Sequence, residues 1–190
     1  DSPAAPILVK GLKRMEYRGY DSVGVATFSG NQILVRKGVG KVADVNNTVK
    51  LDMLSGTVGI GHTRWATHGM VTEVNAHPHP SSSGEIAIVH NGIIDNYDEL
   101  KKELQQKGYT FKSETDSEAI ANLLQYNFDQ TKDIKKSMMQ TLSELKGNYA
   151  FVAVFEDGTL SAARLHEPLI IGVGKDGYFV SSDVLGFVEY

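Results

Sequence analysis

The sequence contains no cysteine, and this absence excludes several kinds of site. None of the 190 residues can form a disulfide framework, a cysteine-ligated zinc site or an iron–sulfur cluster. The chain as given also supplies no cysteine nucleophile. Covalent catalysis through a thiol would therefore need a residue from outside these 190.

Long apolar runs and blocks of basic residues are also lacking. The longest apolar run, Ala150 to Phe155, is far shorter than the roughly 20 residues that span a bilayer. The 19 Lys and Arg residues are outnumbered by 23 Asp and Glu residues, so the net charge is −4 and no basic patch attracts nucleic acid or anionic lipid. Residues 1–6 have no signal-peptide pattern. We therefore expect a cytoplasmic protein that binds neither nucleic acid nor membrane.

The composition is that of one globular domain. Hydrophobic residues make up 41% of the chain and charged residues 22%, both ordinary values. A chain of this length can bury a core without disulfides, so we expect residues 1–190 to form one domain. The first residue is not Met and the last residues follow a strand without a closing element, which indicates a portion of a longer polypeptide.

Apolar periodicity and turn residues predict about eight strands and five helices. Helices are expected over residues 4–15, 43–54, 96–107, 117–128 and 133–145, and strands over 22–28, 32–36, 57–62, 85–90, 149–155, 160–165, 169–173 and 178–182. Most strands follow one another through turns, which predicts antiparallel hairpins. The expected fold is α+β, with two antiparallel sheets stacked on each other and helices outside. The long loop 66–84 is of the kind that carries function.

Polar residues of chemical interest gather where the strand 57–62 enters this loop. Arg64 has a planar guanidinium group that fits a carboxylate, and Thr67 and His68 add further donors. Trp65 can shield a site from water. Taken alone, the segment is explained more simply by a structural ion pair of Arg64 and a core position for Trp65.

Two further groups complete a candidate site. Asn91 and Gly92 follow an apolar strand and lead toward a helix, and an Asn amide beside a Gly N–H is a two-donor cradle for a developing oxyanion. The same dipeptide is also a common hairpin turn. Asp116 supplies an isolated carboxylate for an ammonium group. Because Thr115 and Glu118 have the spacing of a capping box, a purely structural role for Asp116 is the simpler local interpretation.

Five of the six histidines lie in the same region and raise the alternative of a metal-dependent hydrolase. No HExxH helix is present, so we expect His62, His77 and His79 to be structural, with no metal and no cofactor. The glycine-rich segment 37–41 lacks P-loop spacing. In 56–61 the glycines are expected to allow close packing along a strand.

Five motifs occur in the order seen in one enzyme family. They are Glu16–Ser22, Gly61–Gly69, Asn75–His79, Val89–Ile94 and Glu114–Glu118. In their residues and their order they resemble the N-terminal glutaminase domain of the glutamine–fructose-6-phosphate aminotransferases. That domain is a class II glutamine amidotransferase domain. The resemblance covers essentially the whole chain. It implies the fold of the N-terminal-nucleophile (Ntn) hydrolases, a four-layer αββα sandwich, and agrees with the stacked sheets expected above.

The resemblance also implies a reaction. A cysteine that opens a short strand before the first helix attacks the side-chain amide of glutamine, with its own α-amino group as base. Glutamate and ammonia are released, and a sugar-phosphate isomerase half of the full-length enzyme, a homo-oligomer, uses the ammonia to make glucosamine 6-phosphate. Since that cysteine is not in this chain, a non-catalytic module that binds glutamine or glutamate is the alternative.

The roles implied for individual residues follow the motifs. Arg64 would bind the α-carboxylate of glutamine with Thr67 and His68 close by, Asp116 would bind the α-ammonium group, Asn91 and Gly92 would form the oxyanion hole, and Trp65 would gate the passage of ammonia. The loop after Arg64 would be a lid over the substrate.

Overall fold

The computed structural model describes residues 2–66, 69–175 and 177–190. Its helices are α1 (Ala4–Met15), α2 (Val42–Val49), α3 (Tyr97–Gln106), α4 (Asp116–Thr131) and α5 (Ile134–Glu144), with short 3₁₀ helices η1 (Glu16–Arg18), η2 (Leu51–Met53) and η3 (Val184–Gly186). Its strands are β1 (Ser22–Ser29), β2 (Gln32–Val39), β3 (Val58–Arg64), β4 (His79–Pro80), β5 (Ile86–Ile94), β6 (Gly147–Phe155), β7 (Leu160–Leu165), β8 (Ile170–Val173) and β9 (Tyr178–Ser181).

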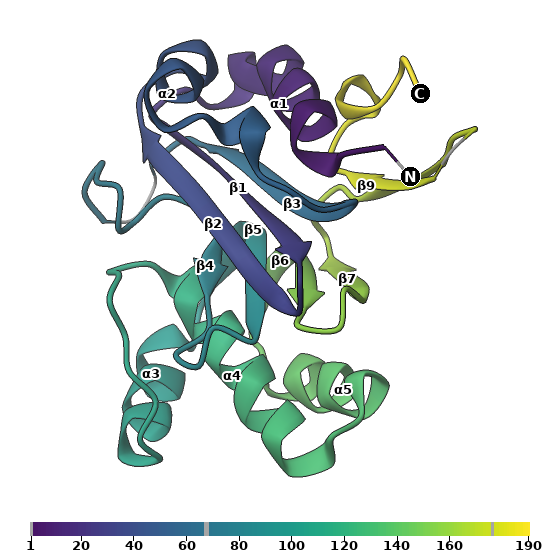
Figure 1. Ribbon diagram of the computed structural model, residues 1–190. Helices are drawn as coiled ribbons and strands as arrows, with labels where there is room; N and C mark the ends of the chain where they lie inside the picture. The colour runs from purple at the N-terminus through teal and green to yellow at the C-terminus, as the bar shows by residue number, and fades with distance from the viewer. Residues whose placement is uncertain (1, 67–68, 176) are drawn as a thin grey trace.

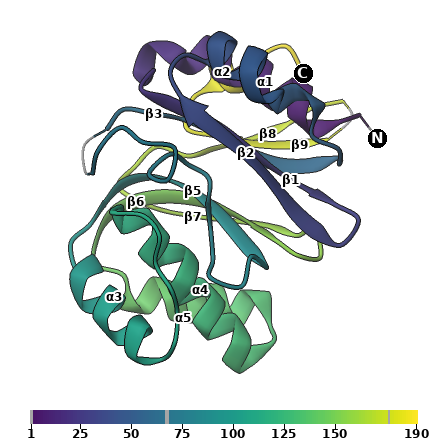
Figure 2. The same ribbon diagram turned by 60° about the vertical axis from the view of Figure 1, so that its left-hand side comes forward.

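The strands form two main antiparallel sheets, with orders β2-β1-β3 and β4-β5-β6-β7. In Figures 1 and 2, α1 and α2 cover the outer face of the first sheet and α3, α4 and α5 cover the outer face of the second. The molecule is therefore the four-layer αββα sandwich that the family resemblance implies. The strands β8 and β9 form a separate small hairpin sheet.

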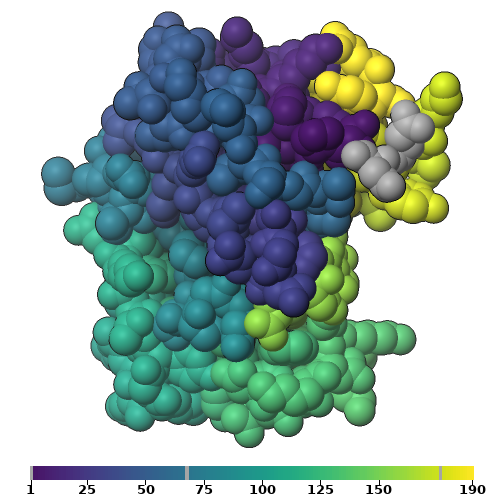
Figure 3. All heavy atoms as spheres, in the orientation of Figure 1, coloured from purple at the N-terminus to yellow at the C-terminus, as the bar shows by residue number. Residues whose placement is uncertain are grey.

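Alternation along the strands explains the layers. Phe151 and Phe155 of β6 belong to the core under α3, α4 and α5. Val152 and Val154 point the other way and belong to the core between the sheets. A third apolar cluster joins β1 to α1 and α2. Because the central strands β1, β5 and β6 are buried along most of their length, each sheet needs a layer on either side. In Figure 3 the purple and dark blue atoms of the N-terminal part lie at one end of the stack and the green atoms of the middle of the chain lie at the other.

Two glycines of β3 let α1 approach the first sheet closely. A Cβ atom at Gly61 would lie 2.9 Å from the Leu12 side chain, and one at Gly59 would lie 3.0 Å from the Leu8 side chain. Both distances are below normal contact, so larger residues would push α1 away. The expectation that these glycines serve close packing is confirmed.

Several element boundaries differ from the sequence prediction, and two of them show the physical reason plainly. The helix expected over 43–54 ends at Val49, because Lys50 adopts a left-handed conformation with φ +55°, and η2 follows. The strand expected over 85–90 continues to Ile94, because residues 91–94 pair with residues 147–150 of β6. The Asn-Gly pair therefore lies inside a paired strand, and not at a hairpin turn or at an unpaired approach to a helix.

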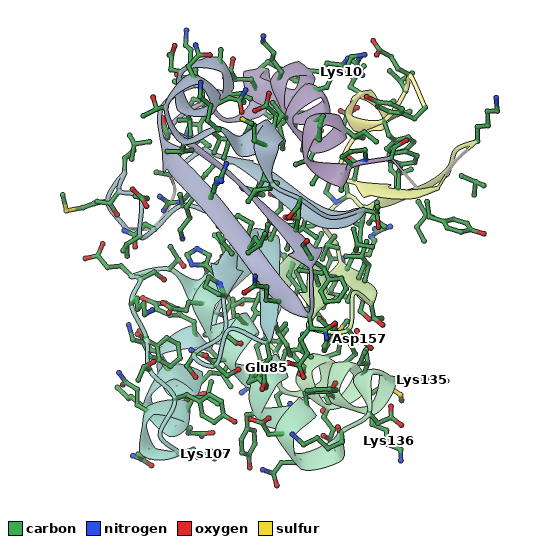
Figure 4. The ribbon with its side chains drawn as sticks, viewed as in Figure 1. Lys10, Glu85, Lys107, Lys135, Lys136 and Asp157 are labelled. Atoms are coloured by element: carbon green, nitrogen blue, oxygen red, sulfur yellow. The ribbon has the colours of Figure 1, made fainter. Side chains whose placement is uncertain are left out.

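The outer faces of the stack carry charge. Lys10 on α1 and Lys136 on α5 project outward at opposite ends of the molecule (Figure 4). None of the helices within the described residues is both long and apolar enough to cross a membrane.

Candidate functional site

One cavity of about 520 Å³ brings together five of the seven residues predicted for the site. Arg64 and Trp65 come from β3 and the residue after it, Asn91 and Gly92 from β5, and Asp116 from the start of α4. The cavity lies where the two sheets and α4 meet. The other two predicted residues, 67 and 68, fall outside the described residues.

Arg64 ends β3 with its side chain turned inward. The residue is only 5% exposed, and its Nη1 donates a hydrogen bond to the carbonyl oxygen of Met70 at 3.3 Å. Burial lowers the pKa of Arg64, while the nearby carboxylates of Asp21 and Asp116 act in the opposite direction. The guanidinium group of Arg64 and the carboxylate of Asp116 therefore attract each other electrostatically.

Asp116 is held by a strand of the second sheet. Its Oδ2 accepts a hydrogen bond from the backbone N–H of Ile94 at 2.9 Å, and the residue is 8% exposed. This contact fixes the start of α4 against the end of β5. Asp116 therefore lines the same cavity as Asn91 and Gly92, although 22 residues separate it from Ile94 along the chain.

The predicted capping box at this helix is wrong. Thr115 makes no capping bond, and its Oγ1 pairs with Nε2 of His79 at 3.1 Å. Glu118 instead accepts from the backbone N–H of Lys112 at 2.8 Å and of Ser113 at 2.6 Å. Because this end of α4 is buried, its side chains find partners on other segments, and capping does not account for Asp116.

Gly92 occupies a backbone position that other residues cannot adopt without strain. Its φ is +116°, and a Cβ atom there would collide with the carbonyl oxygen of Asn148 on β6. Next to it, Oδ1 of Asn91 lies 2.8 Å from Nε2 of His62 on β3. The Asn91 side chain is thus held between the two sheets.

Trp65 lies at the mouth of the cavity and is 56% exposed, so the alternative of a core position is wrong. Its ring meets Tyr20 edge to face, with 5.4 Å between centroids. The next residue is anchored as well, since Asp21 Oδ2 accepts from the backbone N–H of Ala66 at 2.9 Å. Asp21 also donates its own N–H to the Arg64 carbonyl at 3.0 Å.

The first motif, residues 16–22, holds η1 against the residues after β9 at the cavity. Sequence reasoning missed this role. Tyr17 donates its hydroxyl to Asp183 at 3.2 Å, and Arg18 donates to the hydroxyl of Ser182 at 3.2 Å. These bonds join η1 to the residues after β9. The signal in the sequence was the density of polar and aromatic residues immediately after an amphipathic helix.

The loop after β3 is joined to the segment that precedes α4. Glu114 Oε2 accepts from the backbone N–H of Met70 at 3.2 Å and from Nδ2 of Asn75 at 3.0 Å. Asn75 Oδ1 in turn accepts from the backbone N–H of Glu114 at 2.9 Å. Since Arg64 also bonds to Met70, these contacts couple the loop to the guanidinium group.

Four of the histidines lie close together, and His62, His77 and His90 line the cavity. His77, His79 and His90 are buried, His62 is half-buried, and the ring centroids of His62 and His77 are 4.3 Å apart in a stacked arrangement. Removal from water lowers the pKa of His62 and of His90 from 6.5 to about 4, and lowers that of His77 and His79 as well. All four rings are therefore neutral at pH 7. Among the described residues, no group of three or more His, Asp or Glu side chains is arranged to hold a metal ion.

A family model and two solved structures match this chain. Residues 62–188 match the model described as a glutamine amidotransferase domain. The glutamine phosphoribosylpyrophosphate (PRPP) amidotransferase of B. subtilis, complexed with ADP and GMP, is 30% identical, with a TM-score of 0.83 over 98% of this chain and 41% of that one. A structure described as the allosteric regulatory enzyme of purine biosynthesis is 31% identical, with a TM-score of 0.84 over 96% of this chain and 40% of that one.

Curated relatives are more similar in sequence. The glutamine–fructose-6-phosphate aminotransferase [isomerizing] of Methanothermobacter thermautotrophicus is 50% identical over 100% of this chain and 32% of its own length. The protein of the same name from Pyrococcus horikoshii is 46% identical over 98% of this chain and 32% of its own length. The chain thus spans about a third of the length of the curated relatives that it matches.

Proposed function

The chain belongs to the glutamine amidotransferase domain family, and on that premise we propose that residues 1–190 are a glutaminase domain that hydrolyses the side-chain amide of glutamine to glutamate and ammonia. One observation carries the proposal. Arg64, Asp116 and the Asn91–Gly92 pair come from three separate elements and line the same cavity. A guanidinium group, a carboxylate and a two-donor cradle are the groups needed to hold one amino acid at both ends.

In this proposal, the charged end of glutamine lies between Arg64 and Asp116. The guanidinium group binds the α-carboxylate through paired N–H donors, and the carboxylate binds the α-ammonium group. Thr67 and His68 add donors beside the α-carboxylate. The side-chain carbonyl then points at Nδ2 of Asn91 and the N–H of Gly92, which stabilise the oxyanion when the carbonyl carbon becomes tetrahedral.

The pairing of β3 and of β9 supports a place for the strand that would carry the nucleophile. Within the described residues, β3 pairs only with β1 and β9 pairs only with β8, yet both strands line the cavity. The cavity lining also includes the apolar residues Leu12, Val180 and Phe187. We propose that the cysteine-bearing strand implied by the family lies between β3 and β9, with its first residue near Asn91.

The chemistry then proceeds through a thioester. The thiol sulfur attacks the side-chain carbonyl carbon while the free α-amino group of the cysteine accepts its proton. An α-amine has a pKa of about 7.7–8.0, so it can take this proton and return it to the leaving ammonia near neutral pH. Water then attacks the thioester, which releases glutamate and restores the thiol.

The fate of the ammonia is proposed from the relatives. Two relatives named glutamine–fructose-6-phosphate aminotransferase are 46% and 50% identical to this chain. We propose that the whole protein passes ammonia to a sugar-phosphate isomerase half, is a homo-oligomer and works in the cytoplasm. Trp65, exposed at the mouth of the cavity, would gate the passage of ammonia.

Substrate analogues that lack one charged group test the binding scheme in the full-length protein. Glutaramate lacks the α-ammonium group and 4-aminobutanamide lacks the α-carboxylate. The wild type should hydrolyse glutamine and reject both analogues. In Arg64→Ala, the kcat/KM ratio between glutamine and 4-aminobutanamide should collapse, while the ratio between glutamine and glutaramate should persist. Asp116→Ala should show the reverse pattern, because each variant removes the partner of one charge.

Lys136→Ala, at an exposed site on α5, serves as the matched control and should behave as the wild type. A wild-type protein that binds glutamine without releasing ammonia would support the alternative, a non-catalytic binding module. Equal losses for all three substrates in both charge variants would refute the assignment of the carboxylate and ammonium sites.

A further inference from the structure

One hydrogen bond at the cavity crosses from one sheet to the other. His62 of β3, in the first sheet, places Nε2 2.8 Å from Oδ1 of Asn91 of β5, in the second sheet. Sequence reasoning took His62 as structural. Its partner is the side chain that the proposed function places at the oxyanion, so the bond concerns the geometry of that amide.

The chemistry of the two groups fixes the direction of the bond. The Oδ1 atom of Asn91 can only accept a hydrogen bond, so Nε2 of His62 must carry the hydrogen. In a neutral ring, Nδ1 then has only a lone pair. That atom is buried and has no hydrogen-bond partner among the described residues. Among the described residues, the one side-chain hydrogen bond of the ring is therefore with Asn91, and a backbone group of His90 also interacts with the ring.

The His62 ring is held in place from behind. His77 stacks on it, with 4.3 Å between centroids and 19° between the planes. His77 is itself fixed, because its Nδ1 accepts the backbone N–H of His90 at 3.2 Å and its Nε2 lies 3.4 Å from the hydroxyl of Ser117. The side chain that contacts Asn91 thus belongs to a packed and hydrogen-bonded group.

We propose that His62 is a positioning residue for glutamine hydrolysis, since its N–H holds Oδ1 of Asn91 and so turns Nδ2 toward the cavity. This inference rests on the proposed function. An Asn amide can be turned by 180° with little change in shape, but the turned amide would present its oxygen to the developing oxyanion and repel it. A donor fixed at Oδ1 excludes that orientation before the substrate arrives, which is how preorganised donors lower a barrier.

A double-mutant cycle in the full-length protein tests the proposal. His62→Phe keeps a planar ring but removes the donor, and His62→Gln keeps an N–H donor. We expect His62→Phe to lower the kcat for glutamine hydrolysis by about tenfold to a hundredfold with KM little changed, since loss of a whole oxyanion donor costs about 10²–10³. His62→Gln should recover most of that loss. In an Asn91→Ala background, His62→Phe should cause no further loss, because its effect passes through Asn91.

A merely structural role predicts other results. If the losses from His62→Phe and Asn91→Ala multiply in the double variant, or if His62→Gln is as impaired as His62→Phe, the proposal is overturned. Thermal denaturation shows whether each variant is folded, and His62→Met supplies a second variant without a donor if His62→Phe is not. A wild-type protein without glutaminase activity would overturn the proposed function first, and is recognised before any variant is compared.

Discussion

The floor and the rim of the cavity are built in different ways. We define the floor as His62, His77, Asn91, Asp116 and Ser117, which line the cavity. We define the rim as Trp65, which also lines it, together with the neighbouring residues Tyr20, Met70, Val71 and Glu114. Floor side chains bond or stack with groups on other layers. The rim includes large apolar side chains that stand in solvent, such as Met70, which is 69% exposed.

This difference separates two kinds of effect. The geometry of the floor is set by the packing of sheets and helices, so a change there alters both the stability of the fold and the chemical step. The rim is joined to the fold by a few hydrogen bonds, so a change there alters access and substrate binding and leaves the fold intact. Four predictions test this separation.

The largest expected effect is the loss of unfolding free energy when the pH falls and the histidines of the floor take up protons. His62 has a folded-state pKa of about 4 against 6.5 when unfolded, so the unfolded chain takes up its proton first as the pH falls. The free energy of unfolding should be at its maximum above about pH 6.5 and should fall between pH 6.5 and 4. For His62 alone the loss is roughly 3.5 kcal/mol, at about 1.4 kcal/mol per pKa unit. His77, His79 and His90 add to this loss, because burial lowers their pKa in the same way. Urea denaturation across this range measures the slope.

The variant His62→Gln is the control for this prediction. It should reduce the slope of unfolding free energy against pH by up to one proton, because one titrating group is removed. An unchanged slope between pH 5 and 6.5 would mean that His62 is not neutral and desolvated in the folded state.

The next effect is steric. Gly92→Ala should lower the free energy of unfolding by about 2–5 kcal/mol, since it adds strain at a positive φ to a collision with the carbonyl of Asn148. Gly84→Ala is a matched control, because its φ of +81° carries similar strain but no atom lies within 4 Å of the added Cβ. Urea denaturation should show a clearly larger loss for Gly92→Ala, and equal losses would contradict the packing of β5 on β6.

At the rim, Glu114→Gln weakens the contacts that hold the loop to the segment before α4. The backbone N–H of Met70 and the amide of Asn75 lose a charged acceptor. We expect a several-fold rise in the KM for glutamine with kcat and the unfolding midpoint nearly unchanged. Steady-state kinetics and thermal denaturation check this. A lowered kcat with an unchanged KM would place Glu114 with the floor.

The smallest effect on stability is expected for Trp65→Ala. The side chain is more than half exposed and meets one other ring, Tyr20, among the described residues, so the free energy of unfolding should change by less than about 0.5 kcal/mol. The rate of glutamine hydrolysis should persist, while the fraction of ammonia that reaches the sugar product should fall. Coupled assays of glutamate and of amino sugar separate these quantities, and a large drop in stability would show that Trp65 belongs to the core.

The sequence predicted those elements whose signals are local. The spacing of Leu8, Leu12 and Met15 predicted a helix over 4–15, and the helix covers these residues. Apolar residues bounded by turn residues likewise predicted β6 and β7 nearly to their observed ends. The predicted end of β5 failed because it depends on a distant partner, since β5 is extended by pairing with residues 147–150.

The candidate site shows the same division. Residue type alone indicated what four side chains or backbone groups could do chemically, and the structure brings all four to one cavity: Arg64, Asn91, Gly92 and Asp116. The capping box failed because Glu118 bonds to the backbone before the helix, at Lys112 and Ser113.

The sequence by itself determined the inventory of the site among these 190 residues: a guanidinium group, a carboxylate and an amide beside a glycine. Only the tertiary structure decided that His62 contacts Asn91 and that Trp65 lies at the mouth of the cavity. Local sequence encodes the period of burial and the conformations of turns, because these depend on neighbouring residues. The orientation of a side chain against another sheet depends on which strands stack, and the packing of the whole chain sets that arrangement.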